Sequence, residues 1–367
     1  MAGPDPQKEY QRRVARMESR TRGLMLGLAL GDTLGALRGR PPAAGPLRAG
    51  VGTQLACFTT EGLIRAMVRG QHKGVCHPPG VVLHAYCRWA ALQGIEVERM
   101  RRRWVSYPTG RPWPDGWLAG VPALAERRGS APATVAALSR IEDPHSRIAT
   151  GSRGCHALVR TLPVAVAGPH WTEQAGEFAA LTHGDPAARS AAERAAVLLQ
   201  HCLTAPGPDD PGDRGEGIAR EALEKGLVAL PAGDGREGAA TALRYAAEQP
   251  GRRDLLARLA PDATAPSALL GGLYTAASFP GRDRFRAALE FAAGAPDGGS
   301  AACVTGALLG AVHGAEALPA DLVSRHELAW ALDTLARDLL AQIEDSPSGS
   351  EYVRAWDPHW WDRYPGW

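Results

Sequence analysis

The chain has 367 residues, and its 41 lysines and arginines nearly balance its 39 aspartates and glutamates, giving a formal net charge of +2. This balance excludes a broad basic surface for nucleic acid, and 45% hydrophobic with 22% charged residues is ordinary for a folded protein. The longest apolar run, residues 23–31, stops at Asp32, well short of the roughly 20 residues that a membrane span needs. We therefore expect no nucleic-acid partner, no membrane segment and no secretion signal.

The six cysteines are scattered along the sequence and mostly lie in apolar runs. Such spacing is typical of reduced thiols, so we expect a cytoplasmic protein. Cys76 and Cys87 flank His77 and His84, but this spacing fits none of the usual paired zinc patterns. We interpret that segment as a loop followed by the buried face of a helix. Arginine replaces lysine almost throughout the chain, which is what a high-GC bacterial genome would give.

The first 20 residues predict a lead-in helix. Its basic side carries Arg12, Arg13, Arg16 and Arg20. Glu9 and Glu18 interrupt this charge, which argues against an arm that binds nucleic acid. From residue 23 onward the apolar residues recur at helical spacing. The same period returns in residues 58–68, 79–92, 191–203, 239–247 and 284–293.

The last long helix is the most clearly marked. Ser324 and Glu327 have the spacing of a capping box, and an apolar stripe follows from Leu328 to Ile343. No segment alternates β-branched and polar residues between turn signals, and alanine and leucine abound, so the sequence predicts an all-α fold. We expect surface loops at residues 41–52 and 206–217 because turn-forming residues gather there.

These elements predict an all-α chain of one domain, or two at most, that begins with the lead-in helix of residues 1–20. The tail, residues 346–367, is rich in aromatic residues, which are Tyr352, Trp356, Trp360, Trp361, Tyr364 and Trp367. Because acidic residues leave this tail without basic character, we interpret it as a clamp packed on the domain rather than a platform on which bases stack.

Four short segments place unusual residues at expected helix ends or turns. They are residues 27–35, 50–54, 182–186 and 297–300, the last followed by the glycine-containing run 303–310. Close helix packing through small residues explains the glycines of the first and last segments without any ligand. The acids and the histidine in these segments are the candidates for chemistry.

Taken in order, the segments resemble the motifs of the ADP-ribosylglycohydrolase family, enzymes akin to the dinitrogenase-reductase activating glycohydrolase. Residues 31–35, Gly-Asp-Thr-Leu-Gly, resemble the family's Gly-Asp-Ala-Leu-Gly, and residues 53–65 are similar to its second helix. Residues 152–155, together with Arg160 and Pro163, resemble its glycine-rich ligand loop. Thr-His-Gly-Asp-Pro at 182–186 is similar to the family's Thr-His-Gly-His-Pro, and residues 306–310 are similar to its closing Gly-Asn-Leu-Leu-Gly.

The resemblance implies a single-domain orthogonal helical bundle over residues 21–345. Its cleft, in active members, holds two divalent metal ions, usually magnesium or manganese. The metals orient the ribose and activate water, which cleaves the bond between ADP-ribose and a protein side chain or small acceptor. Their ligands come from a Thr-Asp-Asp before the second helix, a late Gly-Asp-x-Asp-Ser/Thr segment and often a Glu soon after the first motif.

This sequence departs from the family pattern at those metal ligands. The matching positions are occupied by Gly39, Gly50, Val51, Gly52 and Gly299. Asp297 and Ser300 are the oxygen donors that remain. Valine and glycine offer no side-chain oxygen, and two neighbouring dications repel each other unless carboxylates offset the repulsion. We therefore expect no cofactor, or at most one weakly held ion at Asp297 and Ser300.

The resemblance also implies a set of ligand-binding residues, which are Ser152, Arg153, Gly154, His156 and His183. His156 and Ala157 replace glycines that let the pyrophosphate approach the backbone in the family. Arg153 and His156 either contact phosphate by charge or lie in solvent. His183 either lies near the ribose or is a turn residue bonded to the backbone. We assign no catalytic residue.

Three functions remain open. We favour a degenerate member, a pseudoenzyme whose residual cleft binds an ADP-ribose-like small molecule, an ADP-ribosylated protein or another protein partner. The alternative is an active hydrolase that cleaves an ADP-ribosyl N- or O-glycosidic bond with a single-metal site rebuilt from Asp32, Asp185 and Asp297. On simpler grounds, Asp32 is expected to pack between helices and Asp185 to cap the helix after Pro186. The third possibility is a structural role in which the aromatic tail pairs with an active paralogue.

Overall fold

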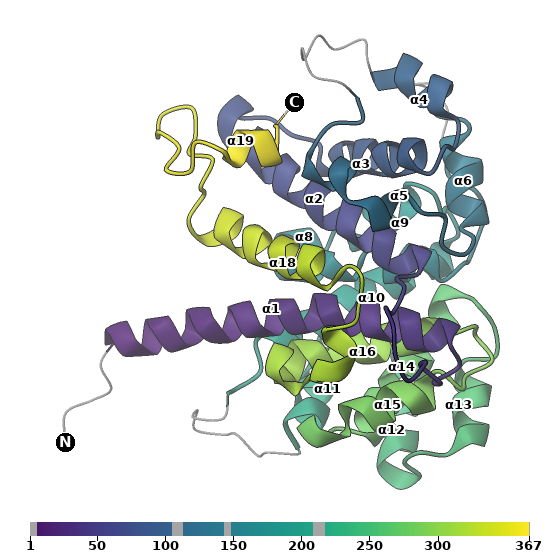
Figure 1. The fold of residues 1–367 in the computed structure, drawn as a ribbon. Helices are drawn as coiled ribbons and strands as arrows, with labels where there is room; N and C mark the ends of the chain where they lie inside the picture. The colour runs from purple at the N-terminus through teal and green to yellow at the C-terminus, as the bar shows by residue number, and fades with distance from the viewer. Residues whose placement is uncertain (1–5, 105–112, 143–147, 208–216, 367) are drawn as a thin grey trace.

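The computed structural model describes residues 6–104, 113–142, 148–207 and 217–366, and these residues form the expected all-α fold. One long helix, α1 (Pro6–Ala36), crosses the molecule (Figure 1). On one side of it lie α2 (Val51–Lys73), α3 (Pro78–Leu92) and α18 (Ala329–Glu344). No strand occurs among the described residues, whose only β-type pairings are isolated bridges.

On the other side of α1 lie α14 (Ala265–Ser278), α16 (Ser300–His313) and their neighbours (Figure 1). The other helices are α4 (Val97–Trp104), α5 (Pro122–Ala125), α6 (Pro132–Leu138), α7 (His156–Val159), α8 (Pro169–Thr172), α9 (Ala175–Ala180), α10 (Pro186–Leu203), α11 (Ile218–Ala229), α12 (Asp234–Glu248), α13 (Arg253–Leu259), α15 (Phe285–Ala292), α17 (Ala320–Val323) and α19 (Trp360–Arg363).

The centre of the fold is the antiparallel pair α1 and α16. Gly23 faces Gly310, and Gly27 faces Gly306 one turn further along. A Cβ atom at Gly23 or Gly27 would lie 2.2 Å from the carbonyl oxygen of the facing glycine, so the two backbones touch. The four-residue glycine spacing in both segments therefore serves close helix packing.

The expected lead-in helix and the apolar helix after it are one continuous element, α1. Arg20 does not belong to an exposed basic side. Its guanidinium is buried and donates hydrogen bonds to the carbonyl oxygens of Val312 and Leu203, both at 3.0 Å. This cation ties α1 to the C-terminal ends of α16 and α10.

Polar residues inside α2 form a buried ion network with α3. Glu61 accepts from Arg88 at 2.6 Å and pairs with Arg65 at 2.8 Å. Arg65 also pairs with Asp115 at 3.1 Å. Because buried charges are costly unless they are paired, this network fixes how α2, α3 and the 113–117 segment meet.

Two expected boundaries differ from the structure. The loop predicted at residues 41–52 ends at Gly50, because α2 already begins at Val51. The capping box predicted at Ser324 and Glu327 is wrong: α18 begins at Ala329, and the Glu327 carboxylate instead accepts from the Ala49 amide at 2.9 Å. Of the loop expected at 206–217, residues 208–216 lie outside the described residues.

The aromatic tail contributes side chains to the core. Trp360 and Tyr364 are buried, and the Trp360 indole donates to the Gln342 side chain of α18 at 2.6 Å. Trp356 is 63% exposed. None of the helices in the described part of the chain has the length and apolar character required to cross a membrane.

Candidate functional site

The ends of α1, α2 and α16 meet at the place where the sequence resembles the family's metal site. Asp32, near the C-terminal end of α1, reaches the first turn of α2. Its Oδ2 accepts from the Thr53 amide at 2.8 Å and from the Thr53 hydroxyl at 2.6 Å. Asp32 therefore caps the N-terminus of α2 from a different helix, where a negative charge also complements the helix dipole.

Gly50 lies directly against this carboxylate. A Cβ atom at Gly50 would be 2.5 Å from Asp32 Oδ1, and one at Gly52 would be 3.0 Å from a methyl group of Val159. The residue between them, Val51, is buried. The positions that resemble Thr-Asp-Asp are thus filled by the neighbouring carboxylate and by apolar packing.

Asp297 has the same role at α16. It is 1% exposed, and its two oxygens accept from the amides of Gly299 and Ala301 at 2.8 and 2.5 Å. Gly299 has φ +109°, and a Cβ atom there would lie 2.6 Å from the Cα of Gly35. An aspartate at position 299 would require the end of α1 and the start of α16 to separate.

These residues do not fit two hard dications. Mg²⁺ and Mn²⁺ need several oxygen ligands that are free to turn toward the ion. Asp32 and Asp297 are committed to backbone amides, and the Ser300 hydroxyl hydrogen-bonds with the Cys155 thiol. Burial raises the pKa of both aspartates above its ordinary value. Among the residues that the structure describes, no three His, Cys, Asp or Glu side chains are grouped as metal ligands.

The third acid of the rebuilt-site alternative is also engaged elsewhere. Asp185 caps α10, as expected, by accepting from the Ala187 amide at 2.8 Å. It also lies 3.9 Å from the guanidinium of Arg153. Asp185 thus holds a helix end and the ligand-loop arginine.

The expected ligand loop is fixed by two isolated bridges. Thr150 pairs with His183, and Gly154 pairs with Thr264 at the start of α14. Within the loop, the Ser152 hydroxyl accepts from the Gly154 amide at 3.0 Å. The structure therefore brings Ser152, Gly154 and His183 together, and leaves the Arg153 side chain exposed beside them.

Of the two histidines of the expected ligand set, His183 is buried and His156 is partly buried. Burial, with a further contribution from the Arg160 cation, lowers the pKa of His156 to about 4 and that of His183 to about 2. Both imidazoles are therefore uncharged at neutral pH, and a charge contact with phosphate falls to Arg153. His183 Nδ1 is 2.8 Å from the Thr182 hydroxyl, so this turn residue bonds to a side chain.

Arg160 organises this part of the site, a role that the sequence does not reveal. It is fully buried, donates to the Thr182 hydroxyl at 2.6 Å and to the Phe178 carbonyl at 3.2 Å, and lies over the Tyr86 ring at 4.5 Å. In the sequence, Arg160 stands out as a charged residue within an apolar run and as part of the resemblance to the family's ligand loop. Arg160 holds the turn that presents His183.

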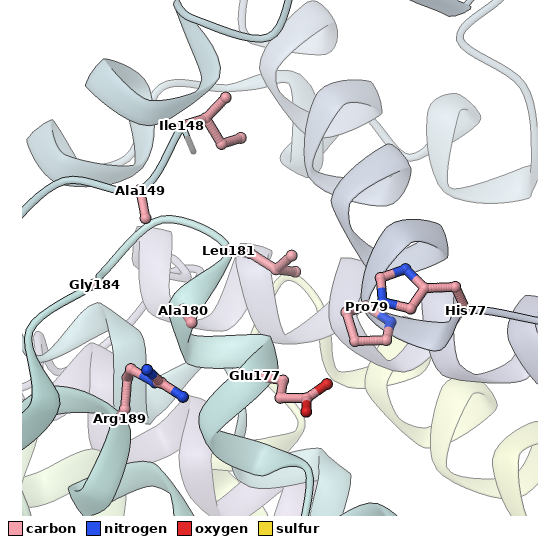
Figure 2. Close-up of a pocket in the computed structure, with 9 residues that line it drawn as sticks. All are labelled: His77, Pro79, Ile148, Ala149, Glu177, Ala180, Leu181, Gly184 and Arg189. Atoms are coloured by element: carbon pink, nitrogen blue, oxygen red, sulfur yellow. The ribbon is translucent and has the colours of Figure 1, made fainter. Parts of the chain in front are cut away.

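A pocket of about 560 Å³ borders the same turn (Figure 2). Gly184 and Ala149 form part of its wall, and Glu177 and Arg189 bring opposite charges to it. None of the five expected ligand residues is among the described residues that line this pocket. It is therefore distinct from the ligand loop.

Comparison with known proteins decides the family. The sequence profile of the ADP-ribosylglycohydrolases matches residues 13–348, which is nearly the whole chain. The chain belongs to the ADP-ribosylglycohydrolase family. A solved structure described as "ADP-ribosylglycohydrolase-related protein complex" matches this family member with a TM-score of 0.57 and 22% sequence identity, covering 90% of this chain and 99% of that one. At this identity the match shows the fold alone. No curated protein sequence matches the chain.

Proposed function

We propose that this ADP-ribosylglycohydrolase family member is a pseudoenzyme that binds an ADP-ribose-like ligand, free or attached to a protein, without the family's two-metal hydrolysis. The observation that carries the proposal is the use of Asp32 and Asp297 as helix caps. A carboxylate that accepts from backbone amides cannot also coordinate a metal through the same lone pairs without uncapping the helix.

The space around the caps supports the same reading. Gly50 and Gly299 lie against neighbouring atoms that leave no room for a larger side chain, and Val51 is apolar. Restoring the missing ligands would therefore require the helix ends to move, in addition to the substitutions themselves. Among the described residues, no group of His, Cys, Asp or Glu side chains could hold two metal ions for such a step.

Ligand capture is the part of the family function that the remaining residues can serve. Arg153 is exposed and held near the turn by Asp185, and a guanidinium is well suited to bind a phosphate. The Ser152–Gly154 turn is held in place by its bridge to Thr264, so its shape does not depend on a metal.

Calorimetry with ADP-ribose, with and without Mg²⁺ or Mn²⁺, tests the proposal. We expect binding whose affinity the metals do not change, and weaker binding by Arg153→Gln. Arg244→Gln, an exposed arginine on α12, is the matched control. Peptides carrying ADP-ribosyl-arginine or ADP-ribosyl-serine should release no ADP-ribose, with an active family enzyme as positive control. Metal-dependent release that Asp297→Ala abolishes, while Asp297→Ala remains folded, would contradict the proposal.

A further inference from the structure

A second pocket, of about 440 Å³, lies beside the N-terminus of α2. Its apolar wall is made by Val51, Trp89, Ile95, Pro132 and Val135. This volume and lining suit a small organic ligand. Val51 occupies a position where the family resemblance expects a metal-binding carboxylate, so the pocket borders the altered metal site. In this chain, the side chain at that position, Val51, is uncharged.

The polar side of the pocket carries an uncompensated positive charge. Arg127 donates from Nε to the Gln93 carbonyl at 3.0 Å, and no carboxylate in the described part of the chain lies within ion-pair distance of it. Glu96 also lines the pocket, but it pairs with Arg99 at 3.2 Å. The guanidinium of Arg127 is therefore the charge that a ligand would meet.

The loop that carries Arg127 is fastened to the start of α2. Arg128 pairs with Glu327 at 3.2 Å, and the other oxygen of Glu327 accepts from the Ala49 amide at 2.9 Å. A Cβ atom at Gly129 would lie 3.9 Å from Val51 Cγ1, so the loop passes against the helix end.

We propose that this pocket binds the phosphate of a nucleotide-like ligand through Arg127, with the base on the apolar wall and with no metal ion. The inference rests on the proposed function, because it names which part of the ligand is held and by which residue. In the family, carboxylates at this place bind metal ions, and the metal ions bind the anionic ligand. In this chain, a neutral wall lies beside an arginine, and the arginine attracts the anion directly.

Titration of the full-length protein with AMP, adenosine and ribose 5-phosphate tests whether the pocket binds a nucleotide through its phosphate and its base. AMP should bind at least about tenfold more tightly than adenosine, which lacks the phosphate, and than ribose 5-phosphate, which lacks the base. Added Mg²⁺ should leave AMP affinity unchanged.

Arg127→Gln should weaken AMP binding at least about tenfold, and Val51→Asp should weaken it because it adds a negative charge to the wall. Arg140→Gln, an exposed arginine outside the pocket, is the matched control. Thermal unfolding midpoints would establish that each variant is folded.

Equal affinity of Arg127→Gln and the unchanged protein for AMP would overturn the inference, as would absence of AMP binding or equal binding of adenosine. The outcome also separates this inference from the proposed function. ADP-ribose binding that depends on Arg153 and not on Arg127 would leave the proposed function standing and overturn the inference. Arg127-dependent AMP binding without ADP-ribose binding would support the inference and overturn the proposed function.

Discussion

Gly50 and Gly299 are positions where a neighbouring segment occupies the space of a side chain. At Gly50 that neighbour is the carboxylate of Asp32, and at Gly299 it is the backbone of Gly35. The family resemblance places a metal ligand at both positions, a threonine at 50 and an aspartate at 299, where this chain has a residue without a side chain and an adjacent segment fills the space. At both positions, therefore, a glycine stands in place of an expected metal ligand, and a neighbouring segment packs closely against it.

Substituting alanine for Gly50 should destabilise the protein by about 2 kcal/mol, because the added methyl group would lie 2.5 Å from the Asp32 carboxylate. Gly120→Ala, where nothing lies within 4 Å, should change the free energy of unfolding by less than about 0.5 kcal/mol. Urea denaturation measures both. The Gly50→Ala/Asp32→Ala double variant should be more stable than the sum of the single effects predicts. Additive effects would show that the clash is not with Asp32.

Asp297 gives a pH-dependent prediction. Burial raises its pKa in the folded protein, so its contribution to stability is fully present below its unfolded pKa of about 3.9 and is lost as pH rises through the higher folded value. Asparagine does not titrate. The stability advantage of the unchanged protein over Asp297→Asn should therefore be larger at about pH 4.5 than at about pH 7.5. Chemical denaturation at both pH values checks this, with exposed Asp283→Asn as control; an advantage that grows with pH would contradict it.

At the scale of elements, the helices that the sequence predicts are those with a long apolar period. Residues 79–92 and 191–203 fall inside α3 and α10 because each helix buries one continuous face. The boundaries that depend on contacts between distant segments are not predictable in this way. Glu327 looks like part of a local capping box, but Ala49 and Arg128 hold it from elsewhere in the chain.

The candidate site divides in the same way. The missing carboxylates are visible from the residue types alone, and so is the Asp185 cap, because it is local to its helix. The capping of α2 by Asp32 cannot be predicted from the residue types, because it joins two helices across a loop. The burial of His183 is also invisible in the sequence, because it depends on Arg160 and on the bridge to Thr150.

The α1–α16 pair gives a prediction at this scale. Gly27→Ala should destabilise the protein by about 3 kcal/mol, because the methyl group would lie 2.2 Å from the Gly306 carbonyl oxygen and rigid backbone cannot move aside. Gly70→Ala, within α2, has no atom nearer than 3.9 Å and should stabilise by up to about 1 kcal/mol through higher helix propensity. Opposite shifts in the thermal midpoint are expected. A shift of the same sign for both would mean that α1 and α16 do not pack as closely as described.

At the scale of the whole molecule, the two ends of the described chain are joined to one helical body. α1 packs on α16 and α18, and the tail returns to α18 through Trp360 and Tyr364. The Tyr364 hydroxyl donates to Asp338 at 2.5 Å, and Arg363 pairs with the same carboxylate. The tail is therefore fastened to α18 through the side chains of Asp338 and Gln342.

This arrangement predicts that the tail unfolds together with the helices. Trp360→Ala should lower the free energy of unfolding by about 3–5 kcal/mol, because it leaves a cavity in the core and removes the indole that donates to the Gln342 Oε1 atom. Trp356→Ala removes the same ring from a site that is 63% exposed and should cost less than about 0.5 kcal/mol. Far-ultraviolet circular dichroism and tryptophan fluorescence should report a single shared transition in each variant. If Trp360→Ala left the helical transition unchanged while only the fluorescence shifted, the tail would be an independent appendage, because a residue that belongs to the core cannot be removed without cost to the helices packed around it.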